Sequence, residues 1–308
     1  MKKIILYIVV LISIPFFVVT YFKVDNYDVK ELELDYLSNV IVRVKGDNSI
    51  ESVFLEDYLV GVVGGEMPAS FELEALKAQT VASRTYVLKK ILDNKHNSYD
   101  VVDNVSNQVY LSLDELKDKW GENYVIYVNK IKEAINSTSL EYLEYNNEII
   151  DVMFFSTSNG YTEDSGVFFS SDLPYLRSVE SSWDEGVASA FNSSTSMSLD
   201  EFYKRLDLQY NDKLVIDDIK KSKSNRVIKL KVNGVELLGK DIYYKLGIRS
   251  LDFVINQVGN NVNIDTKGYG HGVGMSQYGA QGMAKEGYNY KEILSYYYVG
   301  TNLNKIEI

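Results

Sequence analysis

The segment Gly61–Pro68 holds a single carboxyl, Glu66, among glycines, hydrophobic residues and a proline. Few neighbours in the sequence could pair with it, and a carboxyl in an apolar pocket has a raised pKa that lets it donate a proton near neutral pH. The proline helps to end one element and begin another. Glu66 could equally cap the helix that follows, because a helix N-terminus favours negative charge. The residues alone leave both roles open.

Two cations follow Glu66 on a segment that we expect to be a helix, about residues 71–92. Lys77 and Arg84 are seven residues apart, which is about two turns and places them on one face. As a pair they could bind a carboxylate or sugar hydroxyls. Salt bridges within the helix or a solvated face would use the same residues. Gln79 lies roughly opposite that face, and we expect it to be structural.

A second polar segment, Ser156 to Thr162, follows a hydrophobic strand expected at 149–156. Hydroxyl and amide side chains at the end of a strand suit the recognition of a polar ligand. The same residue types are also typical of an ordinary turn.

The third segment, GYGHGVGMSQYGA (268–280), has glycine at every second position from 268 to 274. One side of this extended segment is therefore bare, so something must approach its backbone closely. A neighbouring strand and a ligand are both compatible with the pattern. Neither a nucleophile elbow nor a dinucleotide-binding loop fits, because the last glycine of each motif is missing. His271 could bind a ligand or form hydrogen bonds within a packed loop.

The composition narrows the chemistry further. The chain has no cysteine, which excludes disulfides, iron–sulfur clusters, thiolate zinc sites and cysteine nucleophiles. Two histidines, His96 and His271, leave few nitrogen ligands, so we expect neither a metal nor a cofactor. A net charge of −11 argues against nucleic acid as a partner, because phosphate binding relies on clustered Lys and Arg. Carboxylate, hydroxyl, amide and amine chemistry remains.

The N-terminus predicts a membrane anchor at residues 1–23. Lys2 and Lys3 precede 19 uncharged residues at 4–22, and a helix of about 20 apolar residues spans the hydrocarbon. No small-residue cleavage site follows, which favours a retained single-pass helix over a cleaved signal peptide. The two lysines should stay in the cytoplasm, placing the body outside the cell membrane.

After a stalk at 24–40, residues 41–308 predict one large mixed α+β body. We expect strand-like runs at 41–44 and 52–63, helices at 71–92, 111–135 and 290–298, a buried strand at 149–156, long loops at 157–196, and a β-hairpin at 227–238 around Asn233-Gly234.

Three strings of this sequence resemble the stage II sporulation protein D family, which also includes amidase-enhancer proteins. They are GEMPASFELEALKAQTVASRTY (65–86), FFSTSNGYTED (154–164) and GYGHGVGMSQYGAQGMAKEGYNYKEILSYYYVGT (268–301), and they occur in the family's order. The resemblance implies a lytic transglycosylase that acts on peptidoglycan glycan strands, stripped of stem peptides, during engulfment in endospore formation. Some relatives carry a zinc site of Cys and His near the second motif. Here Ser156 follows Phe155 and neither histidine is nearby, so we expect no metal.

On this resemblance Glu66 matches the family's catalytic glutamate. A lytic transglycosylase can work with one carboxyl, which protonates the oxygen between N-acetylmuramic acid and N-acetylglucosamine. The carboxylate then takes the proton of the muramoyl C6 hydroxyl as a 1,6-anhydro ring closes. The residues expected to hold the glycan are Lys77, Arg84, Ser156, His271, Gln277 and Tyr278.

Three alternatives stay open. Glu72 or Glu74 could be a second carboxylate, which would permit hydrolysis instead. The chain could also be a non-catalytic glycan-binding module that activates an amidase. Finally, it could be a scaffold of an engulfment complex that brings together an amidase and a membrane-protein partner.

Overall fold

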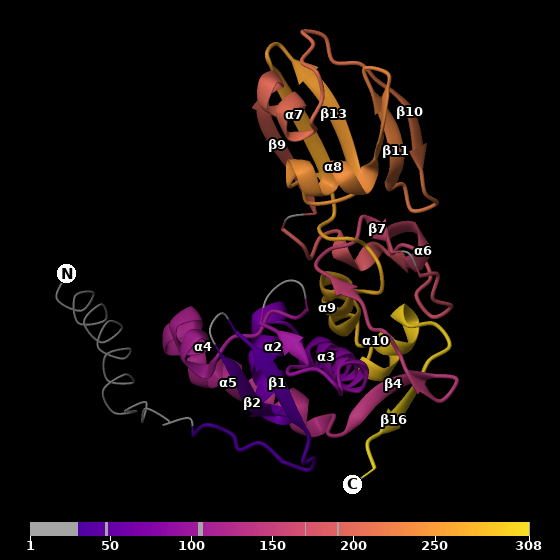
Figure 1. The fold of residues 1–308 in the computed structure, drawn as a ribbon. Coiled ribbons are helices and arrows are strands. Elements are labelled where there is room, and N and C mark those ends of the chain that lie inside the picture. The colour runs from indigo at the N-terminus through magenta and orange to yellow at the C-terminus, as the bar shows by residue number, and fades with distance from the viewer. Residues whose placement is uncertain (1–29, 47–48, 104–106, 170, 190, 308) are drawn as a thin grey trace, which may run out of the picture. The chain divides into compact units, whose positions relative to one another are not determined.

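A computed structural model describes residues 30–46, 49–103, 107–169, 171–189 and 191–307 (Figure 1). The chain divides into two compact units, 1–32 and 33–308, and every element below belongs to the second. The predicted membrane helix at 1–23 lies outside the described residues. Within the described part of the chain, no helix has the length and apolar character needed to cross a membrane.

The second unit is a mixed α+β body, as predicted, and it contains two hydrophobic cores. The first core is built around helices. Its elements are β1 (Ile41–Lys45), β2 (Ile50–Phe54), α2 (Leu55–Glu66), α3 (Leu73–Asp93), β3 (Val101–Val102), α4 (Leu113–Trp120), η1 (Gly121–Asn123), α5 (Tyr124–Ser137), β4 (Glu141–Tyr145), β5 (Glu148–Ile149), β6 (Phe154–Phe155), β7 (Gly160–Tyr161), α6 (Ser165–Phe168), β8 (Glu180–Ser181) and η2 (Ser182–Asp184), and, from the end of the chain, β15 (Met275–Ser276), α9 (Gln277–Lys285), α10 (Tyr290–Tyr297) and β16 (Asn302–Lys305).

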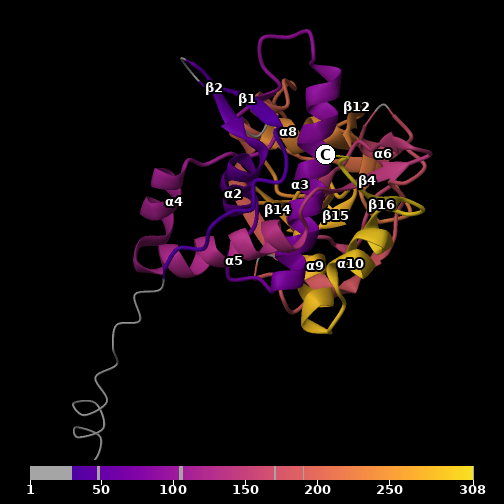
Figure 2. The same cartoon turned by 90° about the horizontal axis from the view of Figure 1, so that it is seen from below.

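Helix α3 runs through the middle of the first core, and Figure 2 shows it among α2, α5, α9 and α10. Its alanines at 75, 78 and 82 are fully buried, so neighbouring helices can approach closely on several sides. The predicted helix at 71–92 is confirmed. The predicted helix at 111–135 is confirmed as α4 and α5, which are separated at Gly121 by a residue with φ +52°.

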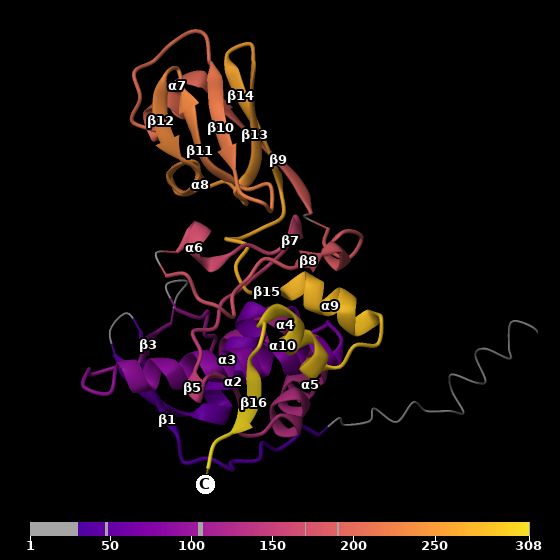
Figure 3. The same ribbon diagram turned by 90° about the vertical axis from the view of Figure 1, so that its right-hand side faces the viewer.

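The second core lies under two three-stranded sheets, of order β13-β14-β9 and β10-β11-β12 (Figure 3). Its elements are β9 (Asn192–Ser198), α7 (Leu199–Arg205), β10 (Ile216–Lys221), β11 (Val227–Val232), β12 (Val235–Leu238), α8 (Gly239–Leu246), β13 (Asp252–Val258) and β14 (Asn261–Lys267). The predicted hairpin is confirmed, since β11 and β12 pair across Asn233 and Gly234, whose φ angles are +48° and +83°.

Two predictions about local structure are wrong. The run 52–63 continues into a helix, α2, because Tyr58–Val63 are buried all round and a buried run has no periodicity that separates strand from helix. The long loops expected at 157–196 are interrupted by the short elements β7, α6, β8 and η2, and they end in the first residues of β9, which its polar composition concealed. The strand expected at 149–156 is reduced to the short β5 and β6, and the final helix is confirmed as α10.

Candidate active site

Glu66 is the last residue of α2, and its side chain is partly buried. Its Oε1 accepts a hydrogen bond of 2.7 Å from the backbone N–H of Val109. The following helix begins at Leu73, after Glu72 in the N-cap position. The capping role considered for Glu66 is therefore wrong, because this carboxylate binds a distant segment instead.

The glycines before Glu66 explain how that segment reaches it. Gly61 and Gly65 lie four residues apart on α2, so they share a face. A Cβ on Gly61 would lie 2.4 Å from the carbonyl oxygen of Leu111, and a Cβ on Gly65 would lie 2.4 Å from that of Val109. Only glycine leaves room for the segment 107–111 against α2. The glycines thus bring the Val109 N–H to the carboxylate.

The surroundings of Glu66 favour a carboxyl that stays protonated to higher pH than an exposed one. Burial raises its pKa, while the Val109 hydrogen bond and the charge of Lys119 lower it, and burial prevails. Lys119 Nζ donates a hydrogen bond of 2.9 Å to the carbonyl oxygen of Gly64, which fixes the cation near the end of α2. A group with a raised pKa that also has stabilising partners for its ionised form can both give and take a proton.

A pocket of about 560 Å³ shares a wall with the Glu66 site. The shared wall is the segment that holds Val109, because its neighbours Asn107 and Gln108 line the pocket. The lining residues are Tyr86, Lys90, Asn107, Gln108, Val152, Met153, Phe154, Phe168, Phe169, Tyr244 and His271.

Tyr86 links the pocket to the carboxylate electrostatically. Its hydroxyl accepts a hydrogen bond of 2.8 Å from Asn107 Nδ2. Burial raises the pKa of Tyr86, the Asn107 hydrogen bond lowers it, and the negative charges of Glu66 and Asp151 raise it. Glu66 itself does not line the pocket, but it bonds to Val109, the residue after the lining residue Gln108.

Lys77 and Arg84 share one face of α3, as their spacing predicted. Lys77 Nζ is 2.7 Å from Glu74 Oε1 and lies over the ring of Tyr290, whose hydroxyl donates to Glu141. Arg84 is 2% exposed and donates to the carbonyl oxygens of Thr138 and Glu141 at 2.9 and 3.1 Å.

The pocket, by contrast, meets α3 at Tyr86, which is about 200° around the helix from Arg84. Neither Lys77 nor Arg84 lines it. The glycan-binding roles assigned to these two cations stay predictions.

The second and third motifs lie side by side. Strands β6 and β15 pair in parallel, and the Tyr278 N–H donates to the carbonyl oxygen of Ser156 at 3.0 Å. Gln277 Nε2 donates to Gln79 Oε1 at 3.3 Å, which joins the third motif to α3. The Tyr278 ring packs edge-on against Phe71, with centroids 5.0 Å apart. Ser156, Gln277 and Tyr278 thus lie together, and their roles toward glycan stay predictions.

The alternating glycines of the third motif accommodate the protein's own chain. Gly272 and Gly274 have φ angles of +86° and +80°. A Cβ on Gly274 would lie 1.9 Å from the carbonyl oxygen of Met153, and one on Gly272 would lie 2.4 Å from Arg226 Cζ. Of the two interpretations of this pattern, close approach of a neighbouring strand is the one that the structure confirms.

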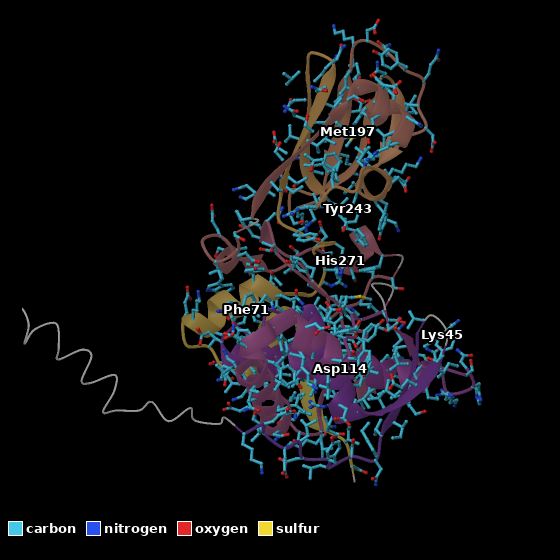
Figure 4. All side chains as sticks on the ribbon, turned by 90° about the vertical axis from the view of Figure 1, so that its left-hand side faces the viewer. Lys45, Phe71, Asp114, Met197, Tyr243 and His271 are labelled. Carbon is cyan, nitrogen blue, oxygen red and sulfur yellow. The ribbon has the colours of Figure 1, made fainter. Side chains whose placement is uncertain are left out.

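His271 does line the pocket, and Figure 4 labels its side chain. Its Nδ1 accepts a hydrogen bond of 3.1 Å from the N–H of Val273, and its ring packs against Phe155, Phe168 and Phe169. Burial, helped by the charge of Arg226, lowers the pKa of His271 to about 4. The imidazole is therefore neutral at pH 7, and it offers the pocket no charge.

The comparisons with known proteins show the family of this chain. A family model described as "Stage II sporulation protein" matches residues 44–145, a range that includes Glu66, Lys77 and Arg84. The chain is 40% identical over 266 residues to stage II sporulation protein D of Bacillus subtilis (strain 168), covering 85% of this chain and 77% of the relative. The chain belongs to the stage II sporulation protein D family.

Two further relatives extend the comparison. Stage II sporulation protein D of Bacillus amyloliquefaciens is 39% identical over 274 residues, which cover 87% of this chain and 79% of the relative. An amidase enhancer of Bacillus subtilis (strain 168) is 29% identical over 299 residues, which cover 80% of this chain and 40% of that protein.

Neither Glu72 nor Glu74 lines the pocket. Glu72 is exposed, and Glu74 is bound to Lys77 and to the backbone N–H of Tyr290. The carboxylate that sequence reasoning missed is Asp151, which precedes the lining residue Val152 and whose charge acts on Tyr86. In the parts of the chain that the structure describes, no group of three or more His, Cys, Asp or Glu residues could hold a metal ion.

A second missed residue, Asp184, holds the motifs together. It is fully buried and accepts hydrogen bonds from the hydroxyls of Ser158, Ser181 and Ser276 and from the Ser158 N–H. The serine-rich composition of 156–182 was the available signal, since buried hydroxyls need an acceptor. Asp184 thus fixes the second motif against the third.

Proposed function

We propose that this chain is a peptidoglycan lytic transglycosylase that cleaves the bond between N-acetylmuramic acid and N-acetylglucosamine, with Glu66 as the acid and then the base. The observation that carries the proposal is the partly buried Glu66, with its raised pKa and its Val109 hydrogen bond, next to a polar and aromatic pocket. Membership of a sporulation family supports a role in cell-wall degradation during engulfment.

The reaction needs two proton transfers, first from Glu66 to the leaving group and then from the C6 hydroxyl to Glu66. Protonated Glu66 gives its proton to the bridging oxygen, the C1–O bond breaks, and an oxocarbenium-like centre forms on the muramoyl ring. The Glu66 carboxylate then takes the C6 hydroxyl proton while O6 bonds to C1, which restores the acid without consuming water. Val109 and Lys119 stabilise the ionised form between the two steps, and burial favours uptake of the second proton, the one from the C6 hydroxyl.

The pocket would hold the sugars beside that carboxyl. Phe168, Phe169 and Tyr244 offer apolar ring surfaces that can pack against sugar rings, and the amides of Asn107 and Gln108 can bond to hydroxyl and acetamido groups. Asp151 is the candidate for a second carboxylate, and its participation would allow hydrolysis instead.

The setting is part of the same proposal. A membrane helix at 1–23, with its N-terminus in the cytoplasm, would hold the body outside the cell membrane against the wall. The likeness to an amidase enhancer supports a cell-wall amidase as a partner. It also supports the second candidate function, a glycan-binding protein that activates such an amidase without cutting glycan itself.

Incubation of the full-length protein with peptide-stripped glycan strands, followed by mass spectrometry, tests the proposal. We expect products with 1,6-anhydromuramoyl ends from the native protein and none from Glu66→Gln. Glu72→Gln is the matched control, because this exposed carboxyl follows Glu66 closely and does not line the pocket. Binding of strands by the native protein without any cleavage would contradict the proposal and favour the amidase activator.

A further inference from the structure

The pocket beside Glu66 contains a single charged side chain among its lining residues, Lys90. The other lining groups are neutral at pH 7, including His271, whose pKa is lowered to about 4. Lys90 is partly buried, and its ammonium group lies where a ligand in the pocket can meet it. Such a cation indicates a ligand that brings the opposite charge.

The other lysines of α3 are already paired with carboxylates. Lys77 lies 2.7 Å from Glu74, and Lys89 lies 3.2 Å from Asp93. Within the described residues no ion pair joins Lys90 to a carboxylate, and its ammonium instead lies 5.3 Å over the centre of the Tyr86 ring. The ring face holds the cation in the pocket without neutralising it.

The position of Lys90 relative to Tyr86 follows from helix α3. Lys90 is four residues after Tyr86, which places it on the same face of α3, about 6 Å further along the axis. The negative charge of Glu66 in turn raises the pKa of Tyr86. A sugar bound in this pocket would therefore meet Tyr86 and Lys90 on the same wall.

We propose that Lys90 binds the lactyl carboxylate of N-acetylmuramic acid and is the residue that selects strands whose stem peptides have been removed. This inference rests on the proposed function of the pocket as a glycan site. In an intact strand the lactyl group is an amide that carries the peptide and has no charge. Removal of the peptide frees a carboxylate, and a carboxylate on an ammonium forms a charge-assisted hydrogen bond.

Because the chain as a whole is negatively charged, the contact between Lys90 and the carboxylate should determine the affinity for the stripped strand. A chain of net charge −11 repels an anionic strand at long range, so the affinity for the carboxylate has to come from short contacts. A phosphate ligand fits less well, because phosphate sites usually combine several cations or backbone N–H groups. One ammonium and several aromatic rings match one carboxylate attached to a sugar.

Two glycan probes that differ in one group test the assignment. The first is a peptide-stripped strand with free lactyl carboxylates, and the second is the same strand with those carboxylates converted to methylamides. Binding is measured by calorimetry on the full-length Glu66→Gln variant, which keeps Lys90 and should not cut either probe. We expect the free carboxylate form to bind about tenfold tighter or more.

Adding Lys90→Met should reduce that ratio to about one, and adding Lys90→Arg should keep it. Lys89→Met is the matched control, because it removes the neighbouring lysine from outside the pocket and should keep the full ratio. In the otherwise native protein, Lys90→Met should raise KM for the carboxylate form with kcat almost unchanged.

Equal binding of the two probes while Lys90 is present would overturn the inference, as would a preference that survives Lys90→Met. These results are distinguishable from failure of the proposed function. A protein that prefers the carboxylate form through Lys90 but makes no anhydro ends would support Lys90 and contradict the transglycosylase. Anhydro ends made without any preference between probes would do the reverse.

Discussion

The Glu66 carboxylate and the Val109 backbone N–H, 43 residues apart in the chain, are joined by a hydrogen bond of 2.7 Å. The bond is possible because Gly61 and Gly65 leave room for the segment 107–111 against α2. It fixes one carboxylate oxygen and offers partial positive charge to the ionised form. The same segment supplies Asn107 and Gln108 to the pocket, so acid and pocket are positioned by one element.

The pH dependence of glycan cleavage should report Glu66. Since burial raises the pKa of this carboxyl above its ordinary 4.5, the protonated acid persists to higher pH, and the rate should fall as pH rises through the raised pKa. The measurement is the initial rate of anhydro-end formation between about pH 4 and 9. Glu72→Gln should leave the profile in place. A rate independent of pH over this range would rule out Glu66 as the essential acid.

Replacing Glu66 with Gln should not weaken the fold at pH 7. A folded-state pKa above the unfolded one means that this group favours the folded state while protonated, and that its contribution is lost as pH rises through the folded pKa. Gln resembles the protonated acid and keeps an oxygen for Val109. Denaturant unfolding should therefore find Glu66→Gln at least as stable as the native protein at pH 7, with the difference shrinking toward about pH 4. A clearly less stable variant at pH 7 would mean that the carboxylate's charge stabilises the fold through Lys119.

The sequence predicted the main helices and the β-hairpin, but it did not predict which segments face one another. The alternating glycines of the third motif predicted that something approaches their backbone closely, and the structure shows that the chain around Met153 does so. The glycines before Glu66 also indicate a close approach. The segment that approaches them has no motif that the sequence could reveal. A local glycine pattern shows that one side of a segment lacks side chains. Only the tertiary structure shows which other segment packs against that side.

Helix α3 illustrates the same limit. Its period correctly placed Lys77 and Arg84 on one face, yet Tyr86 and Lys90, on another face, line the pocket. The helix is buried on several sides, so its hydrophobic pattern does not distinguish the face toward the pocket from the face toward β4 and α10.

Gly274→Ala should destabilise the protein by about 3 kcal/mol or more. The new Cβ would lie 1.9 Å from the carbonyl oxygen of Met153, a backbone atom that cannot move without breaking the pairing of β6 with β15. Gly186→Ala is the matched control, because Gly186 also has a positive φ, +91°, but no atom lies within 4 Å of the place that its new methyl group would take. It should cost only about 1 kcal/mol of backbone strain. Chemical denaturation of both variants gives the comparison, and equal losses would show that the close approach is not limiting.

Arg84 and Lys77 should behave differently when each is replaced with Met. Arg84 is enclosed and binds two backbone carbonyl oxygens, so Arg84→Met leaves buried acceptors unpaired and should lower the free energy of unfolding by about 2–4 kcal/mol. Lys77 is paired with Glu74 near the surface, and Lys77→Met should change it by less than about 1 kcal/mol.

Glycan binding separates structure from recognition in this pair. If Arg84 acts through the fold, Arg84→Lys should lose stability and retain affinity for peptide-stripped strands in the fraction that stays folded, because the cation does not line the pocket. A variant with native stability and strongly weakened binding would instead place Arg84 on the glycan. That result would require α3 to turn or the Thr138 and Glu141 contacts to open when substrate binds, since both carbonyl oxygens now occupy its guanidinium.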